Sequence, residues 1–106
     1  MSTPEEVFEH LVETQLAHSG ISVGKMFGSR VLKVTGKVFG MVVKGRLVVK
    51  LPKERVEELL RSGLVAPFDP GHGKPSKESV AVGAIASQRW PRLVDEARDF
   101  VRSAVK

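Results

Sequence analysis

The apolar positions nearest the N-terminus recur at helical spacing. They are Val7, Phe8, Leu11, Val12 and Leu16. In front of this stripe, Thr3 can act as the N-cap, Pro4 suits the first helical position, and Glu6 can close a capping box with Thr3. Gly20 can end the helix in a left-handed conformation. The pattern therefore predicts a first helix that begins at Pro4 and runs toward Gly20.

From Arg30 onward the apolar pattern changes to a period of two, which is typical of strands. Three short β-rich runs follow, at residues 30–34, 37–43 and 46–51. They are separated by the dipeptides Thr35-Gly36 and Lys44-Gly45, and connections this short can join only antiparallel neighbours. The expected structure is a β-meander.

The second and third of these runs differ in the composition of their two faces. In the third run, one face is apolar and holds Leu47, Val49 and Leu51, while the other is mixed and holds Arg46, Val48 and Lys50. In the second run, alternation predicts two apolar faces, with Phe39, Met41 and Val43 opposite Val38, Gly40 and Val42. Either a central strand covered on both sides or a sheet face used for dimerisation would explain the second run.

The rest of the chain predicts two more helices and one more strand. Residues 53–62 suit a short helix that ends at Gly63, with Val56, Leu59 and Leu60 facing inward. Residues 65–77 suit an irregular loop, and residues 78–82 suit a strand. Trp90-Pro91 opens a final helix, whose apolar stripe is Leu93, Val94, Ala97, Phe100, Val101 and Ala104. Its expected solvated side is Arg92, Asp95, Glu96, Arg98, Asp99 and Arg102.

The element order α-β-β-β-α-β-α predicts an α+β fold, with an antiparallel sheet flanked by helices. We expect a single domain over residues 1–106, because neither an internal repeat nor a linker divides the sequence. The 42% of hydrophobic and 27% of charged residues are ordinary values for a globular domain with one modest core.

Several chemistries are excluded or disfavoured by the residues present. The sequence has no cysteine, which excludes disulfides, a thiol nucleophile and a thiolate zinc site. Glu6, His10 and Glu13 share one side of the first helix, but a solvated acidic face explains them better than a metal site. We expect no enzyme activity, metal or cofactor. The N-terminus lacks a secretion signal, and the longest apolar run, 80–86, is too short to span a membrane, so we expect a cytoplasmic protein without membrane contact.

The formal net charge of +5 is concentrated in the predicted sheet. Residues 25–50 contain seven Lys or Arg residues and no acidic one. Two interpretations are open, a polyanion-binding surface or strands that solvate their open face with Lys and Arg. The candidate polyanion contacts are Lys33, Lys37, Arg46 and Lys50.

The loop after the second predicted helix contains the other candidate site. Flexible backbone amides, an imidazole and an ammonium lie close together there, so the loop could cradle an anion or contact a partner. The candidate residues are Asp69, Gly71, His72, Gly73 and Lys74. The alternative is a turn-rich connection whose Phe68 fills a gap in the core.

Six short motifs, taken with their order and spacing, carry a family resemblance. They are Met26-Phe27-Gly28, Gly36-Lys37 with Phe39, Leu47 to Lys50 before Leu51-Pro52, Leu59-Leu60 with Gly63, Pro67-Phe68-Asp69-Pro70 with Gly73, and Trp90-Pro91. From about Phe8 to Val101 the chain resembles the N-terminal domain family of the bacterial competence regulators TfoX/Sxy. The resemblance implies a small α+β domain with an antiparallel sheet flanked by helices.

The sequence differs from the family pattern in two respects. Family members often have Met after the loop proline and Trp three residues later, whereas this chain has Ser76 and Ser79. The competence regulators also carry a second, helical domain, and we expect this chain to be a stand-alone N-terminal domain without it. Regulation that depends on that second domain is therefore not implied here.

The resemblance favours a non-enzymatic regulatory domain of a bacterial protein, acting by contact with a protein partner or with a second copy as a homodimer. The alternative is a nucleic-acid-binding protein that uses the basic segment 25–50. A third hypothesis is an enzyme or small-ligand binder that uses His72 and Lys74.

Overall fold

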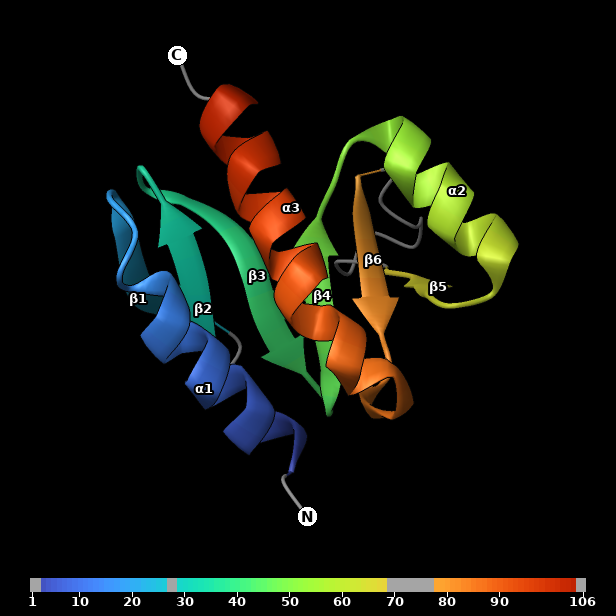
Figure 1. Ribbon diagram of the computed structural model, residues 1–106, viewed down its shortest axis with the longest axis horizontal. Coiled ribbons are helices and arrows are strands. Elements are labelled where there is room, and N and C mark those ends of the chain that lie inside the picture. Colours follow the sequence, from blue (N-terminus) through green and yellow to red (C-terminus); the bar gives the residue numbers. More distant parts are fainter. Residues whose placement is uncertain (1–2, 27–28, 69–77, 105–106) are drawn as a thin grey trace.

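Over the residues it describes, 3–26, 29–68 and 78–104, the computed structural model has a six-stranded antiparallel sheet with the order β1-β2-β3-β4-β6-β5 (Figure 1). The strands are β1 (Ile21–Met26), β2 (Ser29–Val34), β3 (Lys37–Val43), β4 (Arg46–Lys50), β5 (Ala66–Pro67) and β6 (Ser79–Val82). The helices are α1 (Pro4–Gln15), α2 (Lys53–Ser62), the 3-10 helix η1 (Ala84–Arg89) and α3 (Trp90–Ala104). Helices α1 and α3 cross one face of the sheet, and α2 lies beside its β6 and β5 edge. The predicted α+β fold is confirmed.

Helix α1 begins as predicted but ends earlier than expected. The hydroxyl of Thr3 accepts a hydrogen bond from the Glu6 amide at 3.1 Å, and the Thr3 amide donates to the Glu6 carboxylate at 3.0 Å, so the capping box is present. The helix ends at Gln15 with Leu16 as its C-cap, and Leu16 is 48% exposed, so its predicted place on the apolar stripe was wrong. Gly20, with φ +77°, lies in the turn before β1 rather than at the end of the helix.

The three predicted strands of the meander are confirmed as β2, β3 and β4, each pair of neighbours being antiparallel. Sequence patterning missed β1 and the short β5, and it did not anticipate η1. The strand predicted at 78–82 is confirmed as β6, which pairs with β4 in the sheet. The predicted helix over 53–62 is confirmed as α2, and Gly63, with φ +79°, ends it.

A β-bulge overturns the predicted facing of β3. Leu32 pairs with Gly40 while the adjacent Lys33 pairs with Val38, so Phe39 is an extra residue on β3. The bulge places both Phe39 and Val42 in the core beneath the helices. The predicted grouping of Phe39 with Met41 was therefore wrong, because the alternation shifts by one residue at the bulge.

The sheet is packed on both faces. The helix-covered face carries the main core, in which Trp90 is fully buried and its indole nitrogen donates to the Gly83 carbonyl oxygen at 3.2 Å. The opposite face, here called the second face, carries a smaller buried cluster of Val31, Met41, Val48 and Ala81. These four are successive cross-strand partners in one row over β2, β3, β4 and β6. Met41 is only 8% exposed. Burial of both faces of β3 within one chain therefore accounts for the apolar sequence of this strand.

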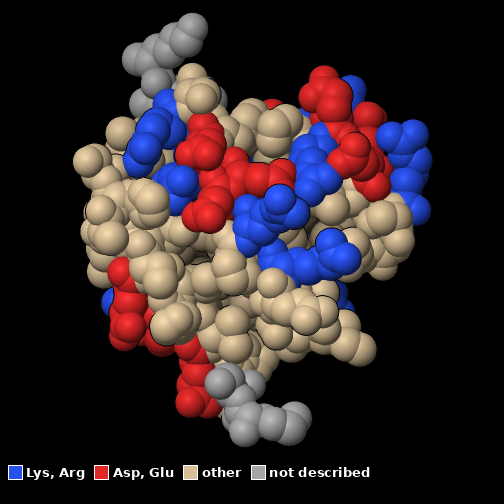
Figure 2. Space-filling view, in the orientation of Figure 1, with Lys and Arg blue, Asp and Glu red and all other residues tan. Residues whose placement is uncertain are grey.

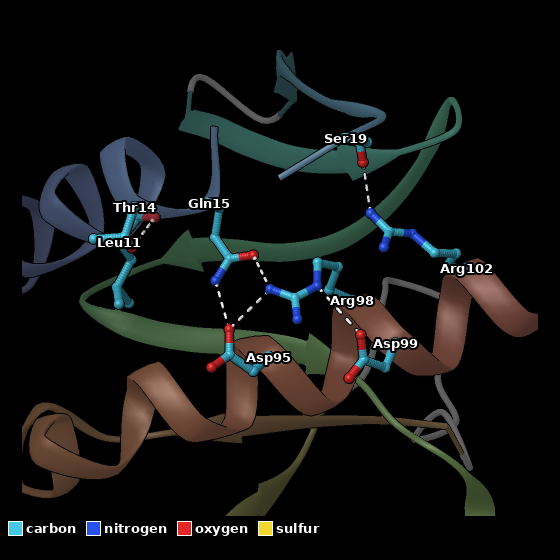
Figure 3. A network of polar contacts seen from close by, with 8 residues as sticks. All are labelled: Leu11, Thr14, Gln15, Ser19, Asp95, Arg98, Asp99 and Arg102. Carbon is cyan, nitrogen blue, oxygen red and sulfur yellow. Dashed lines mark hydrogen bonds and ion pairs between the residues drawn. The ribbon is translucent and has the colours of Figure 1, made fainter. Parts of the chain in front are cut away.

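A polar network with two buried members, Gln15 and Arg98, joins the end of α1 to the middle of α3 (Figure 3). Gln15 donates to Asp95 at 2.8 Å, and Arg98 donates to Gln15 at 2.9 Å and to Asp95 at 3.0 Å. Gln15 is 3% and Arg98 9% exposed. The prediction that Arg98 belongs to the solvated side of the last helix was wrong, because its guanidinium is turned onto α1.

Candidate functional site

The candidate loop residues Asp69, Gly71, His72, Gly73 and Lys74 lie outside the described residues. The predicted loop site therefore stays a prediction. The neighbouring Phe68 is described, and it packs half-buried against the cluster on the second face of the sheet. This position agrees with the interpretation in which Phe68 contributes to the hydrophobic packing.

Three of the four candidate polyanion contacts lie on the second face. Arg46 and Lys50 lie two residues before and two residues after the buried Val48 on β4, so they share its face. Lys33 is the cross-strand partner of Val38, which packs against the same cluster. Lys37 instead pairs with Val34, a residue of the main core. Directly opposed residues of an antiparallel pair share a face, so Lys37 is separated from the other three.

The basic residues of the second face are available for contact. Arg46 and Lys50 are exposed, and Lys33 is half-buried because its side chain runs over Gly24, where an added Cβ would lie 2.8 Å from the Lys33 Cε. Over the described part of the chain, none of the three forms an ion pair. Among the described residues, the second face thus presents three positive charges without an ion-pair partner around a buried apolar row.

A separate pocket of about 190 Å³ opens between α2, β6, η1 and the start of α3. We call it the arginine pocket. Its apolar lining is Leu59, Leu64, Val65, Val82 and Leu93. Its polar lining is Arg55, Gln88, Arg89 and Arg92.

The fold positions this lining in two ways. Arg55 and Leu59 are one helical turn apart and therefore share a face of α2, and the left-handed Gly63 then turns the chain so that Leu64 follows into the lining. On the other side, the hydrogen bond from Trp90 to the carbonyl of Gly83 ties the start of α3 to the residue that precedes η1. Both walls of the pocket are thus anchored to the core.

The three arginines of the pocket differ in their partners. Arg55 donates to both carboxylate oxygens of Glu96, at 2.8 and 3.1 Å, and also pairs with Glu58. The hydrogen bond to Glu96 is the main cause that raises the pKa of Arg55. Arg89 and Arg92 are exposed, and within the described residues neither has a hydrogen bond or an ion pair. Figure 2 shows Lys and Arg side chains gathered between α3 and α2.

The arrangement offers an apolar floor and, at its rim, two guanidinium groups that have no partner among the described residues. Guanidinium groups bind carboxylates and phosphates through paired N–H donors. Ile85, which belongs to η1 together with Gln88 and Arg89, is 99% exposed and adds apolar surface to the same element. The site can therefore hold an apolar group of a ligand that also carries negatively charged groups beside it.

Sequence reasoning did not find this pocket. Arg92 was expected on the solvated side of the last helix, which is correct, but η1 was not predicted and Arg89 was not singled out. The available clue was a pair of arginines that flank Trp90-Pro91, a dipeptide with an obvious structural role. The local periodicity of the sequence does not indicate that these two arginines lie close to Leu59 and Leu64 in space.

Comparison with known protein families shows to which family the chain belongs. The family described as the TfoX N-terminal domain matches residues 14–105. The chain belongs to the TfoX N-terminal domain family. No curated protein matches it. Both the second-face cations and the arginine pocket of this TfoX N-terminal domain lie inside the matched segment. Over the described residues, no helix combines the length and apolarity needed to cross a membrane.

Proposed function

We propose that this TfoX N-terminal domain is a non-enzymatic regulatory module that acts by contact with another protein. The observation that carries the proposal is the arginine pocket, in which Arg89 and Arg92, both unpaired within the described part of the chain, border an apolar floor. Arginine and exposed apolar side chains are characteristic of contact surfaces between proteins. The described lining consists of Leu, Val, Arg and Gln, which suits binding better than proton transfer or nucleophilic attack.

Sedimentation in lysate tests this proposal. The fluorescently labelled domain is sedimented both as a purified protein and in a lysate of its natural host. We expect a faster-sedimenting species in lysate, which is lost on addition of excess unlabelled domain. A labelled domain that sediments identically in both media would overturn the proposal. A purified domain that sediments faster as its own concentration rises would identify the partner as a second copy.

A second candidate function is nucleic-acid binding through the second face. Lys33, Arg46 and Lys50 favour it, because three cations on one surface, without ion pairs to other described residues, can contact phosphates. The pocket arginines lie elsewhere, on the helix-bearing side near α2 and α3, so variants can separate the two candidates. The salt dependence of DNA binding is the appropriate measurement.

A further inference from the structure

We propose that the arginine pocket binds one apolar side chain of an acidic protein segment. This inference rests on the proposed function and specifies the chemistry of the partner. The segment places a Leu-, Met- or Phe-sized group against the apolar floor. Carboxylates on either side of that group pair with Arg89 and Arg92 at the rim.

The size of the pocket favours a single side chain over a free metabolite. Sites for small molecules commonly enclose roughly 300–1,000 Å³. A cavity of about 150 Å³ in a protein core is large enough for a benzene ring. At about 190 Å³, the arginine pocket has room for a benzene-sized or leucine-sized group and little more. A single side chain of a partner polypeptide fits that limit, because the rest of the polypeptide can contact the surface outside the pocket.

The charges around the pocket favour a short acidic segment over a nucleic acid. Arg55 is already occupied by Glu96 and Glu58, so its carboxylate partners bring negative charge next to the pocket. An extended polyanion would have to pass those carboxylates, whereas individual Asp or Glu side chains can reach Arg89 and Arg92 and avoid them. The local arrangement thus selects discrete carboxylates near the rim.

The apolar floor also separates this site from a simple anion site. Leu59, Leu64 and Leu93 offer no donor to a phosphate or sulfate ion, so a free anion would use only the rim. Ile85, at 99% exposed, adds apolar surface to η1, the element that also supplies Gln88 and Arg89 to the lining. Both features add affinity only when the ligand carries apolar groups together with its charge.

A selection from random peptides tests the inference, because it reads out the preferred ligand chemistry directly. A displayed library of random dodecapeptides is selected on the immobilised domain, in parallel with a variant that carries Arg89→Glu and Arg92→Glu. Arg89 and Arg92 are both exposed, and an acidic residue in the first turn of α3 is favourable to the helix, so this variant should fold. A second variant, Lys37→Glu with Lys44→Glu, lowers the net charge equally at exposed positions away from the pocket.

We expect the wild-type domain and the Lys37/Lys44 control to enrich peptides with one large apolar residue flanked by Asp or Glu. The pocket variant should bind a selected peptide at least about tenfold more weakly, as should the wild type when the apolar residue of the peptide is replaced by serine. Gln88→Trp, which puts an indole at the rim of the pocket, should weaken the same peptide by steric exclusion. Inorganic phosphate at millimolar concentration should not displace it.

Three results would overturn the inference: no enrichment, enrichment without an acidic and apolar pattern, or equal binding by the pocket variant. If the pocket variant still sediments faster in lysate, the domain has a partner but contacts it elsewhere, so the inference fails while the proposed function stands. If the wild type shows no lysate complex, the proposed function itself fails.

Discussion

Arg98 donates a 2.9 Å hydrogen bond to the side-chain oxygen of Gln15, although the two residues are 83 positions apart. Gln15 also donates to Asp95, which in turn accepts from Arg98, so the three side chains form a closed network between α1 and α3. The network joins the first helix of the domain to the last on the same face of the sheet. It therefore contributes to the helix layer that covers the main core.

The first prediction concerns this network. Gln15→Ala should lower the free energy of unfolding by about 1–3 kcal/mol, because it leaves the guanidinium of Arg98 with one buried contact fewer. Chemical denaturation measures the change. Replacing both Gln15 and Arg98 by leucine should destabilise the domain by less than the sum of the two single replacements. Neither buried polar group is then left without its partner, and Asp95, whose side chain is 53% exposed, can be solvated by water. Additive effects would contradict the coupling.

The second prediction concerns Trp90, whose indole is buried and bonded to the carbonyl of Gly83. Trp90→Phe should lower the free energy of unfolding by about 1–3 kcal/mol, because the Gly83 oxygen keeps only its bond from the Ala86 amide and the smaller ring leaves a gap. Thermal unfolding followed by circular dichroism measures this. Because the bond ties η1 to α3, the same variant should also weaken ligand binding at the arginine pocket, whereas Gln15→Ala should leave it unchanged.

The third prediction concerns acid sensitivity at the start of α1. The hydrogen bond from the Thr3 amide is the main cause that lowers the pKa of Glu6 below its ordinary value. A carboxylate whose pKa is lowered in the folded state stabilises that state at any pH above its ordinary pKa. This contribution is lost as the pH falls through the lowered pKa. Amide hydrogen exchange of the first turn, corrected for its intrinsic pH dependence, should therefore lose protection on acidification below about pH 4.5.

Thr3→Ala provides the matching control for the capping box. Loss of the N-cap hydroxyl should lower the free energy of unfolding by about 1 kcal/mol at neutral pH. It should also reduce the acid dependence of the first turn, because the Thr3 hydroxyl also helps to lower the Glu6 pKa. An unchanged pH profile in this variant would show that the hydroxyl adds little to the effect of the Thr3 amide, which the variant retains.

The fourth prediction concerns DNA binding by the second face. Three phosphate contacts, from Lys33, Arg46 and Lys50, predict a log–log slope of about −2.7 for the association constant against salt, which is a loss of about 40-fold between 50 and 200 mM. Fluorescence anisotropy with labelled duplex DNA measures it. Lys33→Glu with Lys50→Glu should reduce both affinity and slope, and Lys37→Glu with Lys44→Glu should have a smaller effect. Equal effects of the two pairs would show that binding depends on net charge alone.

Local patterns predicted most of the secondary structure because capping, alternation and helical spacing are properties of neighbouring residues. β1 escaped prediction because Ser22, Gly24 and Lys25 dilute its apolar positions, and it is recognisable as a strand only through its pairing with β2. The bulge at Phe39 escaped because one inserted residue changes the facing of a strand without altering its composition.

The candidate site was less predictable, because it depends on contacts between residues that are distant in the sequence. The arginine pocket combines residues from 55 to 93 whose proximity arises only when α2 packs beside η1 and α3. The burial of Arg98 likewise depends on its distant partner Gln15. By contrast, the facing of Arg46 and Lys50 followed correctly from alternation, because β4 has a regular register with β3.

Comparative capture from a lysate of the natural host tests the central claim, that the domain acts by protein contact through the arginine pocket. The wild type, the variant with Arg89→Glu and Arg92→Glu, and the control with Lys37→Glu and Lys44→Glu are immobilised at equal density, and bound proteins are quantified by mass spectrometry. We expect a partner that is retained equally by the wild type and the control, and at least about tenfold less by the pocket variant. Equal retention by all three proteins, or no protein retained above an unrelated domain of the same size, would contradict it.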